Sequence, residues 1–205
     1  MMPIPRASSA HVRAKRLRRR GEILHSALRA FRARGYHATT LEDIAAQLGI
    51  RSAALYHYFP DKDAILYACH REALAEVERL LAEAKAKHAN AREQLRYAIH
   101  EHVRVMTDTL EGSALALEVS ALSPRRRAEV VAERDRYERG LREIVEAGVR
   151  RGEFRAVDPK LAVFAILGAI NWIARWYRPE PDGAVGPAEL GAHFADHLVQ
   201  GLTPP

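Results

Sequence analysis

The spacing of apolar residues is the feature that most limits what this chain can fold into. Nearly every segment repeats apolar side chains at intervals of three and four residues, and no segment alternates apolar and polar residues as a half-buried strand does. Spacing of this kind places the apolar side chains along one face of a helix. The sequence therefore predicts an all-α fold.

The first helix is expected to end at Gly35, because glycine suits the left-handed conformation that often follows a helix. Its inward face is predicted from apolar residues at helical spacing. These residues are Leu17, Leu24, Leu28 and Phe31.

Two short helices are expected next. The first begins at Thr40, which forms a capping arrangement with Asp43, and Gly49 stops it. The second covers residues 52–58, and Pro60 breaks the chain after it. Two short helices joined by a tight turn that contains glycine form a helix-turn-helix. The N-terminal part is thus predicted to be a three-helix head.

The remaining chain is predicted to form an antiparallel bundle, which brings the total to about nine helices. The expected helices cover residues 62–87, 91–110, 112–122, 125–151, 158–178 and 188–201. The helix over residues 125–151 carries a buried stripe that includes Val130, Val131 and Tyr137. Residues 161–174 have almost no polar face, so this helix is expected to be buried on all sides.

Positive charge is concentrated at the N-terminus. Residues 1–62 contain 12 Lys and Arg against 4 Asp and Glu, which gives +8, whereas the rest of the chain contains 20 against 22, which gives −2. A basic segment on a nearly neutral body is typical of a nucleic-acid-binding head. A solvated basic tail would give the same charge, so charge alone leaves both interpretations open.

Several other classes of protein are not supported. Cys69 is the single cysteine, which excludes an intramolecular disulfide and favours the reducing cytoplasm. No apolar run is long enough for export or for spanning a membrane. His193 and His197 have no third ligand nearby, so no metal is expected. No nucleophile with a base and no phosphate-binding loop is present, so we expect neither an enzyme nor a cofactor.

Three motifs in the head resemble the DNA-binding head of the TetR family of repressors. They are GYHATTLEDIA at residues 35–45, LGI at residues 48–50 and LYHYFPDK at residues 55–62. The resemblance implies a homodimeric regulator that releases DNA when a small molecule enters its C-terminal domain. It places the DNA-binding domain at residues 1–62 and the ligand-binding and dimerisation domain at residues 63–205.

The same resemblance assigns residues that position the head on DNA. The hydroxyl and backbone N–H of Thr40 would contact a phosphate, and Lys62 would do so with its charge. Tyr56 and Tyr58 resemble the aromatic pair of the family, of which one hydroxyl reaches a phosphate while the other ring packs or touches a sugar.

Base reading is assigned to the N-terminal end of the recognition helix. The residues there are Arg51, Ser52, Ala54 and His57, and Arg51 is the best candidate for a guanine contact. The sequence departs from the family here, because Arg51 and Ala53 stand where a Ser and a Gly are common. Ser52 is a possible substitute for the missing helix cap.

The C-terminal half is similar to the branch of the family that controls fatty-acid, steroid-ring or aromatic-acid breakdown and responds to acyl-CoA thioesters. The similarity rests on GEF at residues 152–154, GAINWIARWYRP at residues 168–179 and GL at residues 201–202. It assigns ligand binding to Trp172, Arg175, Trp176 and Arg178, since arginines suit phosphates and aromatic rings suit adenine. The alternative is that these residues only build the dimer interface.

Together these patterns predict a repressor that binds a palindromic double-stranded operator as a homodimer, with an acyl-CoA as its effector. One alternative is a regulator of the same type that senses another hydrophobic ligand or a free carboxylic acid. The other is an architectural DNA-binding protein without a ligand. The second is less favoured, because the C-terminal body is larger than dimerisation requires.

Overall fold

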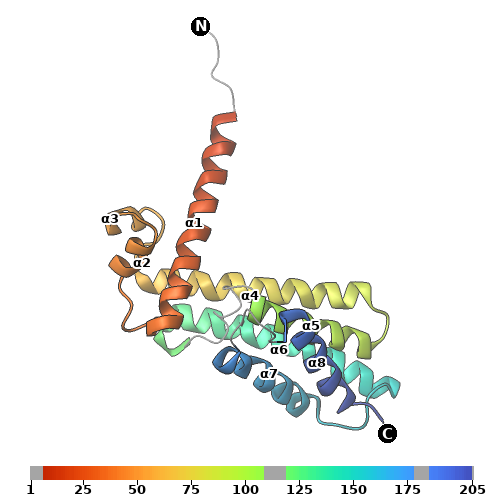
Figure 1. The fold of residues 1–205 in the computed structure, drawn as a ribbon. Coiled ribbons are helices and arrows are strands. Elements are labelled where there is room, and N and C mark those ends of the chain that lie inside the picture. The colour runs from red at the N-terminus through yellow and green to blue at the C-terminus, as the bar shows by residue number, and fades with distance from the viewer. Residues whose placement is uncertain (1–6, 109–118, 178–184, 205) are drawn as a thin grey trace. The chain divides into compact units, whose positions relative to one another are not determined.

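The computed structural model describes residues 7–108, 119–177 and 185–204. This part of the chain contains eight α-helices, one short 3-10 helix and no strand, so the all-α prediction is confirmed (Figure 1). The chain forms two compact units, Met1–Ala68 and Cys69–Pro205. The division between the units lies inside one helix. Among the described helices, none combines the length and the apolar character that a membrane crossing requires.

The first unit consists of α1 (Ala7–Arg34), α2 (Leu41–Gln47), α3 (Ser52–Leu55) and the start of α4 (Lys62–Lys87). α1 packs against α2, and α2 packs against α3. The core of the unit is formed by Ile23, Leu24, Leu28, Phe31, Ile44, Leu55 and Phe59. The prediction that Leu17 faces inward is wrong, because Leu17 is 60% exposed. It lies on the first turns of α1, where every residue from 10 to 18 is exposed.

The turn between α2 and α3 has the expected chemistry. Gly49 adopts a φ of 63°, a left-handed conformation that glycine tolerates best, and α2 ends just before it. α3 is shorter than the predicted helix over residues 52–58. After Leu55 the chain forms a turn in which the N–H groups of Tyr58 and Phe59 both donate to the Leu55 carbonyl oxygen, at 2.8 and 2.9 Å.

The second unit contains the remainder of α4, α5 (Ala91–Asp108), η2 (Val119–Ala121), α6 (Pro124–Arg151), α7 (Pro159–Trp176) and α8 (Pro187–Gln200). α5 packs against α6, α7 and α8, so it is the central helix of the bundle (Figure 1). Most of the helix expected over residues 112–122 lies outside the described residues. Its described end is the 3-10 turn η2.

The buried stripe of α6 differs from the prediction at one position. Val130 and Tyr137 are buried as expected, but Val131 is 42% exposed. Neighbouring residues of a helix point about 100° apart, and at this position the buried face of α6 includes Val130 but not Val131.

Residues 152–155, which we call the clasp, hold three segments of the second unit together. Gly152 ends α6 in a left-handed conformation with a φ of 72°. The Glu153 Oε2 atom then accepts hydrogen bonds from the N–H groups of Ala91 and Arg92, at 2.6 and 3.2 Å. These N–H groups begin α5 and have no partner inside their own helix. Glu153 therefore caps a helix that starts 62 residues earlier in the sequence.

The clasp also holds the end of the chain. Phe154 is 2% exposed and packs so tightly on Gly148 that a Cβ atom there would collide with its ring. The Arg155 N–H donates to the Leu202 carbonyl oxygen at 2.8 Å, and its Nε donates to the Gly201 carbonyl oxygen at 3.0 Å. The C-terminal residues are thus attached to the turn that follows α6.

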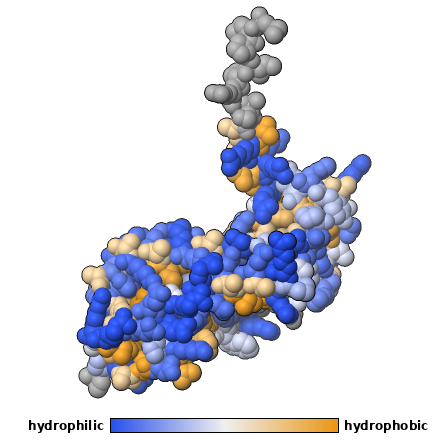
Figure 2. Space-filling view, turned by 180° about the vertical axis from the view of Figure 1, so that it is seen from behind, coloured by the Kyte–Doolittle hydropathy of each residue, from blue (hydrophilic) through white to orange (hydrophobic). Residues whose placement is uncertain are grey.

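α7 has an apolar face that the described chain does not cover. Asp158 caps its N-terminus, and Val163, Ile166, Ile170 and Ile173 are buried against the bundle. On its other faces large apolar residues are 49–65% exposed. They are Leu161, Phe164, Trp172 and Trp176. Apolar patches among hydrophilic side chains are also visible on the face shown in Figure 2. α7 is therefore not buried on all sides within one chain.

Candidate functional site

The residues predicted to read bases, and the predicted aromatic pair Tyr56 and Tyr58, lie together on α3 and the turn that follows it. Arg51, Tyr56 and His57 are exposed, and Tyr56 is 56% exposed. Ser52, Ala54 and Tyr58 are half-buried. Leu55 and Phe59 face the core of the head, so the neighbouring side chains must point outward.

Arg51 occupies the N-cap position of α3. Its backbone is extended and no side chain caps the helix. The possibility that Ser52 acts as the cap is therefore wrong, because Ser52 is already the first residue inside the helix. The Arg51 guanidinium is left exposed at the helix start, where side chains of a recognition helix reach base edges.

Thr40 and Asp43 form the capping box that the sequence predicted. The Thr40 hydroxyl and backbone N–H both donate to the Asp43 Oδ2 atom, each at 2.9 Å. The Thr40 backbone N–H, its hydroxyl and the nearby Arg34 guanidinium hold the pKa of Asp43 below its usual value. Both groups that the sequence assigned to a phosphate are thus used inside the head.

Lys62 joins the start of α4 to the connector between α1 and α2. Its Nζ atom donates to the carbonyl oxygens of Thr39, Tyr36 and His37, at 2.7, 2.8 and 3.5 Å. Burial lowers the pKa of the Lys62 ammonium group. The structure therefore gives Lys62 a role inside the head that its sequence position did not indicate.

The basic N-terminal segment belongs to a helix. Residues 13–20 lie within α1, where Arg18 and Arg19 pair with Glu22 at 3.7 and 2.6 Å. The Arg20 guanidinium lies 4.5 Å from the centre of the ring of Phe59, a residue of the turn after α3. This segment is a basic helical surface continuous with the head, rather than a tail.

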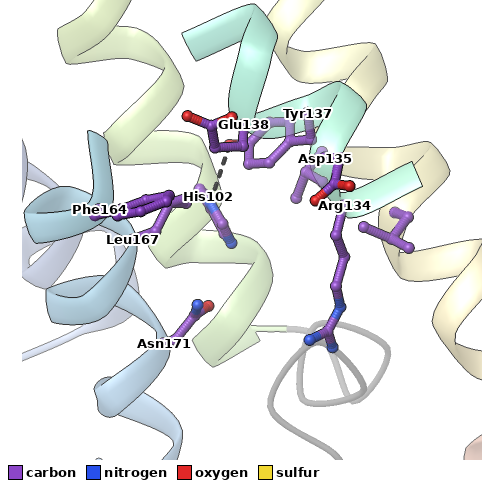
Figure 3. Close-up of a pocket in the computed structure, with 10 residues that line it drawn as sticks. His102, Arg134, Asp135, Tyr137, Glu138, Phe164, Leu167 and Asn171 are labelled. Atoms are coloured by element: carbon purple, nitrogen blue, oxygen red, sulfur yellow. Dashed lines mark hydrogen bonds between the residues drawn. The ribbon is translucent and has the colours of Figure 1, made fainter. Parts of the chain in front are cut away.

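The second unit contains a pocket of about 200 Å³ between α4, α5, α6 and α7 (Figure 3). Apolar side chains from α4 and α7 form part of its wall, and polar side chains from α5, α6 and α7 form the rest. The lining residues are Leu74, Val77, His102, Arg134, Asp135, Tyr137, Glu138, Phe164, Leu167 and Asn171.

His102 and Tyr137 form a buried hydrogen-bonded pair in this pocket. The Tyr137 Oη and the His102 Nδ1 atoms are 2.9 Å apart, and the rings meet edge to face. Burial lowers the pKa of His102 to about 4 and raises the pKa of Tyr137. Both side chains are therefore uncharged at neutral pH, so the pair presents dipoles rather than charge to the pocket.

The predicted ligand residues lie elsewhere. Trp172, Arg175 and Trp176 do not line the pocket, and both tryptophans are exposed. The Arg175 guanidinium lies 5.7 Å from the centre of a Trp172 ring, and Trp176 stacks on Phe194 with ring centres 6.5 Å apart. Arg178 lies outside the described residues.

Sequence reasoning did not identify His102 or Arg134 as pocket residues. Tyr137 was placed on the buried stripe of its helix, and a buried hydroxyl needs a partner. That requirement is the signal that points to a polar residue on a facing helix. His102 and Tyr137 are 35 positions apart in the sequence, so the sequence alone does not identify His102 as the partner.

Comparison with protein families gives two matches. Residues 23–69 match the family model described as bacterial regulatory proteins, tetR family. Residues 88–202 match the model described as the tetracyclin repressor-like C-terminal domain.

Individual proteins give similar results. The HTH-type transcriptional repressor KstR2 of Rhodococcus jostii is 32% identical over 193 residues, which cover 91% of this chain and 92% of that protein. The TetR family transcriptional regulator PfmR of Thermus thermophilus is 36% identical with a TM-score of 0.79, and 89% and 99% of the two chains are covered. AibR, solved in complex with isovaleryl coenzyme A and operator DNA, is 29% identical with a TM-score of 0.78, and the coverage is 91% and 99%.

Proposed function

Since this chain belongs to the TetR family of bacterial regulatory proteins, we propose that it represses transcription from a palindromic operator and is released by a CoA thioester. The chain is a TetR-type transcriptional regulator, so operator DNA and a second copy of the chain are its macromolecular partners. Its relatives are repressors, and we accordingly propose that it binds without catalysing a reaction. We assign it to the cytoplasm, where bacterial operators are found.

The DNA-binding assignment is supported by the exposed end of α3. Arg51 and His57 project from the recognition segment, while Leu55 anchors that segment in the core. We propose that Arg51, Ser52, Ala54 and His57 read base edges. The contacts proposed for positioning the head come from Thr40, Tyr56, Tyr58 and Lys62, and they require Thr40 and Lys62 to exchange some of their internal hydrogen bonds for phosphate oxygens.

The effector assignment is carried by one observation, the pocket between α4, α5, α6 and α7. Its volume of about 200 Å³ lies below the range of about 300–1,000 Å³ that is common for small-molecule sites. A complete CoA thioester does not fit, so we propose that the acyl end occupies the pocket and the nucleotide lies outside it. AibR, which has a similar fold, was solved with isovaleryl coenzyme A, and this likeness favours a CoA thioester.

Three outward-facing residues of α7, Trp172, Arg175 and Trp176, remain our candidates for the nucleotide part, together with Arg178, which lies outside the described residues. Arg175 and Arg178 would bind phosphates, and Trp172 and Trp176 would stack on adenine. The exposed apolar surface of the same helix also suits a subunit interface. Both roles fit on one helix if the nucleotide lies at the edge of that interface.

Operator release tests the effector. We would measure fluorescence anisotropy of labelled operator DNA with free CoA, short, long and ring-bearing acyl-CoAs, and the corresponding free acids. The expected result is release by an acyl-CoA but not by free CoA or by the acids. Because binding is reciprocal, operator DNA should weaken acyl-CoA binding by the same factor. Release by the acids alone would replace the thioester with a carboxylate effector.

A pair of variants tests the nucleotide site. Arg175→Ala should weaken the response to the acyl-CoA and leave operator affinity unchanged. Arg139→Ala, an exposed arginine of α6, should change neither. Operator binding that no tested compound reverses would favour the architectural alternative.

A further inference from the structure

Two polar atoms of pocket-lining side chains have no hydrogen-bond partner in the described part of the chain, the Nε2 atom of His102 and the Oε1 atom of Glu138. His102 is only 3% exposed, and its Nε2 atom has no hydrogen-bond partner among the described residues. In Figure 3 the Nδ1 atom faces Tyr137, while the other ring nitrogen points into the space between Asn171 and Arg134. Buried polar groups nearly always have a partner, so an unused one that points into a pocket indicates a ligand.

Tyr137 determines which nitrogen of the His102 ring carries the proton. The Tyr137 hydroxyl has one hydrogen, and in the described part of the chain its only hydrogen-bond partner is the His102 Nδ1 atom at 2.9 Å. A proton on Nδ1 would leave both the hydroxyl hydrogen and the Nε2 lone pair unpaired. The arrangement with fewer unpaired groups has Tyr137 donating to Nδ1 and the imidazole proton on Nε2.

The charges of the pocket do not favour a carboxylate ligand. Its lining includes two carboxylates, Asp135 and Glu138, and one guanidinium, Arg134. Glu138 also pairs with Arg142 at 2.8 Å. The lining therefore offers no excess of positive charge, and His102 adds none at neutral pH because burial lowers its pKa to about 4. A ligand with an uncharged acceptor avoids the repulsion that a carboxylate would meet from Asp135 and Glu138.

On the basis of the proposed function, we infer that the Nε2–H group of His102 donates a hydrogen bond to an uncharged carbonyl oxygen of the effector. Tyr137 is the positioning residue that holds the ring and its tautomer. A thioester supplies such an oxygen, whereas a free acid at neutral pH presents a charged carboxylate. The apolar part of the effector then contacts Leu74, Val77 and Leu167.

Ligand pairs that differ only in the carbonyl group test this contact. We would measure binding of butanoyl-CoA and octanoyl-CoA, and of the S-butyl and S-octyl thioethers of CoA, by isothermal titration calorimetry. The wild type should bind each thioester about tenfold or more tightly than its thioether. His102→Leu should bind the two alike, and His102→Gln, which keeps an N–H group near the Nε2 position, should retain part of the preference. Leu167→Val is the control, because it should weaken both ligands equally.

The tautomer can be tested without any ligand. Long-range ¹H–¹⁵N NMR of the protein labelled in its histidine rings distinguishes protonated nitrogens from nitrogens with a lone pair, and the spectrum of His102→Gln identifies the His102 signals. A proton on Nε2 is expected in the wild type, and Tyr137→Phe should lose this preference. A proton on Nδ1 in the wild type overturns the inference, as does equal binding of thioester and thioether.

The binding experiments would give a different result if the effector is not a CoA thioester. If no CoA compound binds, the thioester assignment is wrong, and the role of His102 is then decided by a medium-chain methyl ketone and the fatty acid of equal length. Ketone binding that His102→Leu abolishes would support the carbonyl contact. Equal behaviour of the wild type and His102→Leu toward the ketone would refute it.

Discussion

The Lys62 ammonium group donates a hydrogen bond of 2.8 Å to the Tyr36 carbonyl oxygen and lies 4.3 Å from the centre of the Tyr36 ring. One side chain at the start of α4 therefore donates hydrogen bonds to carbonyl groups of the connector that precedes α2. Helices α2 and α3 lie between this connector and the start of α4 in the sequence. Lys62 therefore affects DNA binding through the shape of the head as well as through its charge.

Lys62→Met is expected to lower the free energy of unfolding by about 1–3 kcal/mol, because the half-buried carbonyl groups of Tyr36 and Thr39 lose their donor. Operator and random DNA should lose affinity to a similar extent. Denaturant unfolding and anisotropy would measure the two effects. Lys15→Met, at an exposed position of α1, should leave stability unchanged. Unchanged stability of Lys62→Met would contradict the internal role of this residue.

Arg51→Ala is expected to weaken operator binding by about 1–3 kcal/mol and to relax discrimination at one base pair, because a bidentate contact to guanine is lost. Binding to random DNA should change much less. Arg32→Ala removes an exposed charge from the last turn of α1 and is the control for electrostatics. Equal losses on operator and random DNA would remove Arg51 from the base-reading residues.

Stability should fall as the pH is lowered below neutrality. Burial lowers the pKa of His102 to about 4, and burial with the charge of Arg134 lowers that of His70 to about 3, against 6.5 for an unperturbed histidine. Between these values the unfolded chain binds protons that the folded chain does not. Stability from these groups is complete above pH 6.5 and is lost progressively toward pH 4, by several kcal/mol.

Urea unfolding between pH 8 and pH 5 would measure this dependence. His70→Leu should show a shallower loss of stability with falling pH, because it removes a buried imidazole whose ring nitrogens have no hydrogen-bond partner in the described chain. His193→Leu, at a position of α8 whose side chain is 70% exposed, should behave like the wild type. The same slope for all three proteins would mean that the buried histidines do not control acid stability.

Trp172→Glu is expected to dissociate the dimer. Trp172 is 61% exposed in a single chain and shares α7 with other exposed apolar residues, an arrangement that soluble monomers avoid. A charge that becomes buried in such an interface has no partner. Light scattering at micromolar concentration would show the change. Val131→Glu, which alters an exposed apolar residue of α6, should remain dimeric.

Local patterns in the sequence predicted most of the fold. The capping box of Thr40 and Asp43, the turn at Gly49 and the start of α7 at Asp158 depend on residues that are close in sequence, so their chemistry can be read directly. Leu17 was misplaced because periodicity shows which face of a helix is apolar, but not how far along the helix its neighbours extend.

The candidate sites were predicted unevenly for the same reason. Arg51 and its neighbours form one short segment, so a single motif identifies them. The pocket is assembled from four helices, and the pairing of His102 with Tyr137 depends on how those helices pack. Trp172 and Arg175 were conspicuous in the sequence, yet their helix directs them away from this pocket.

The clasp has a consequence for how regulators of this type are classified. Its residues are among those that make the C-terminal half recognisable, and each has a mechanical role. Gly152 ends a helix, Glu153 caps another and Phe154 fills the space beside Gly148. None of them lines the pocket. Two proteins that share these positions therefore share an architecture and can still respond to unrelated metabolites, so effector families are better defined by the residues that face the pocket.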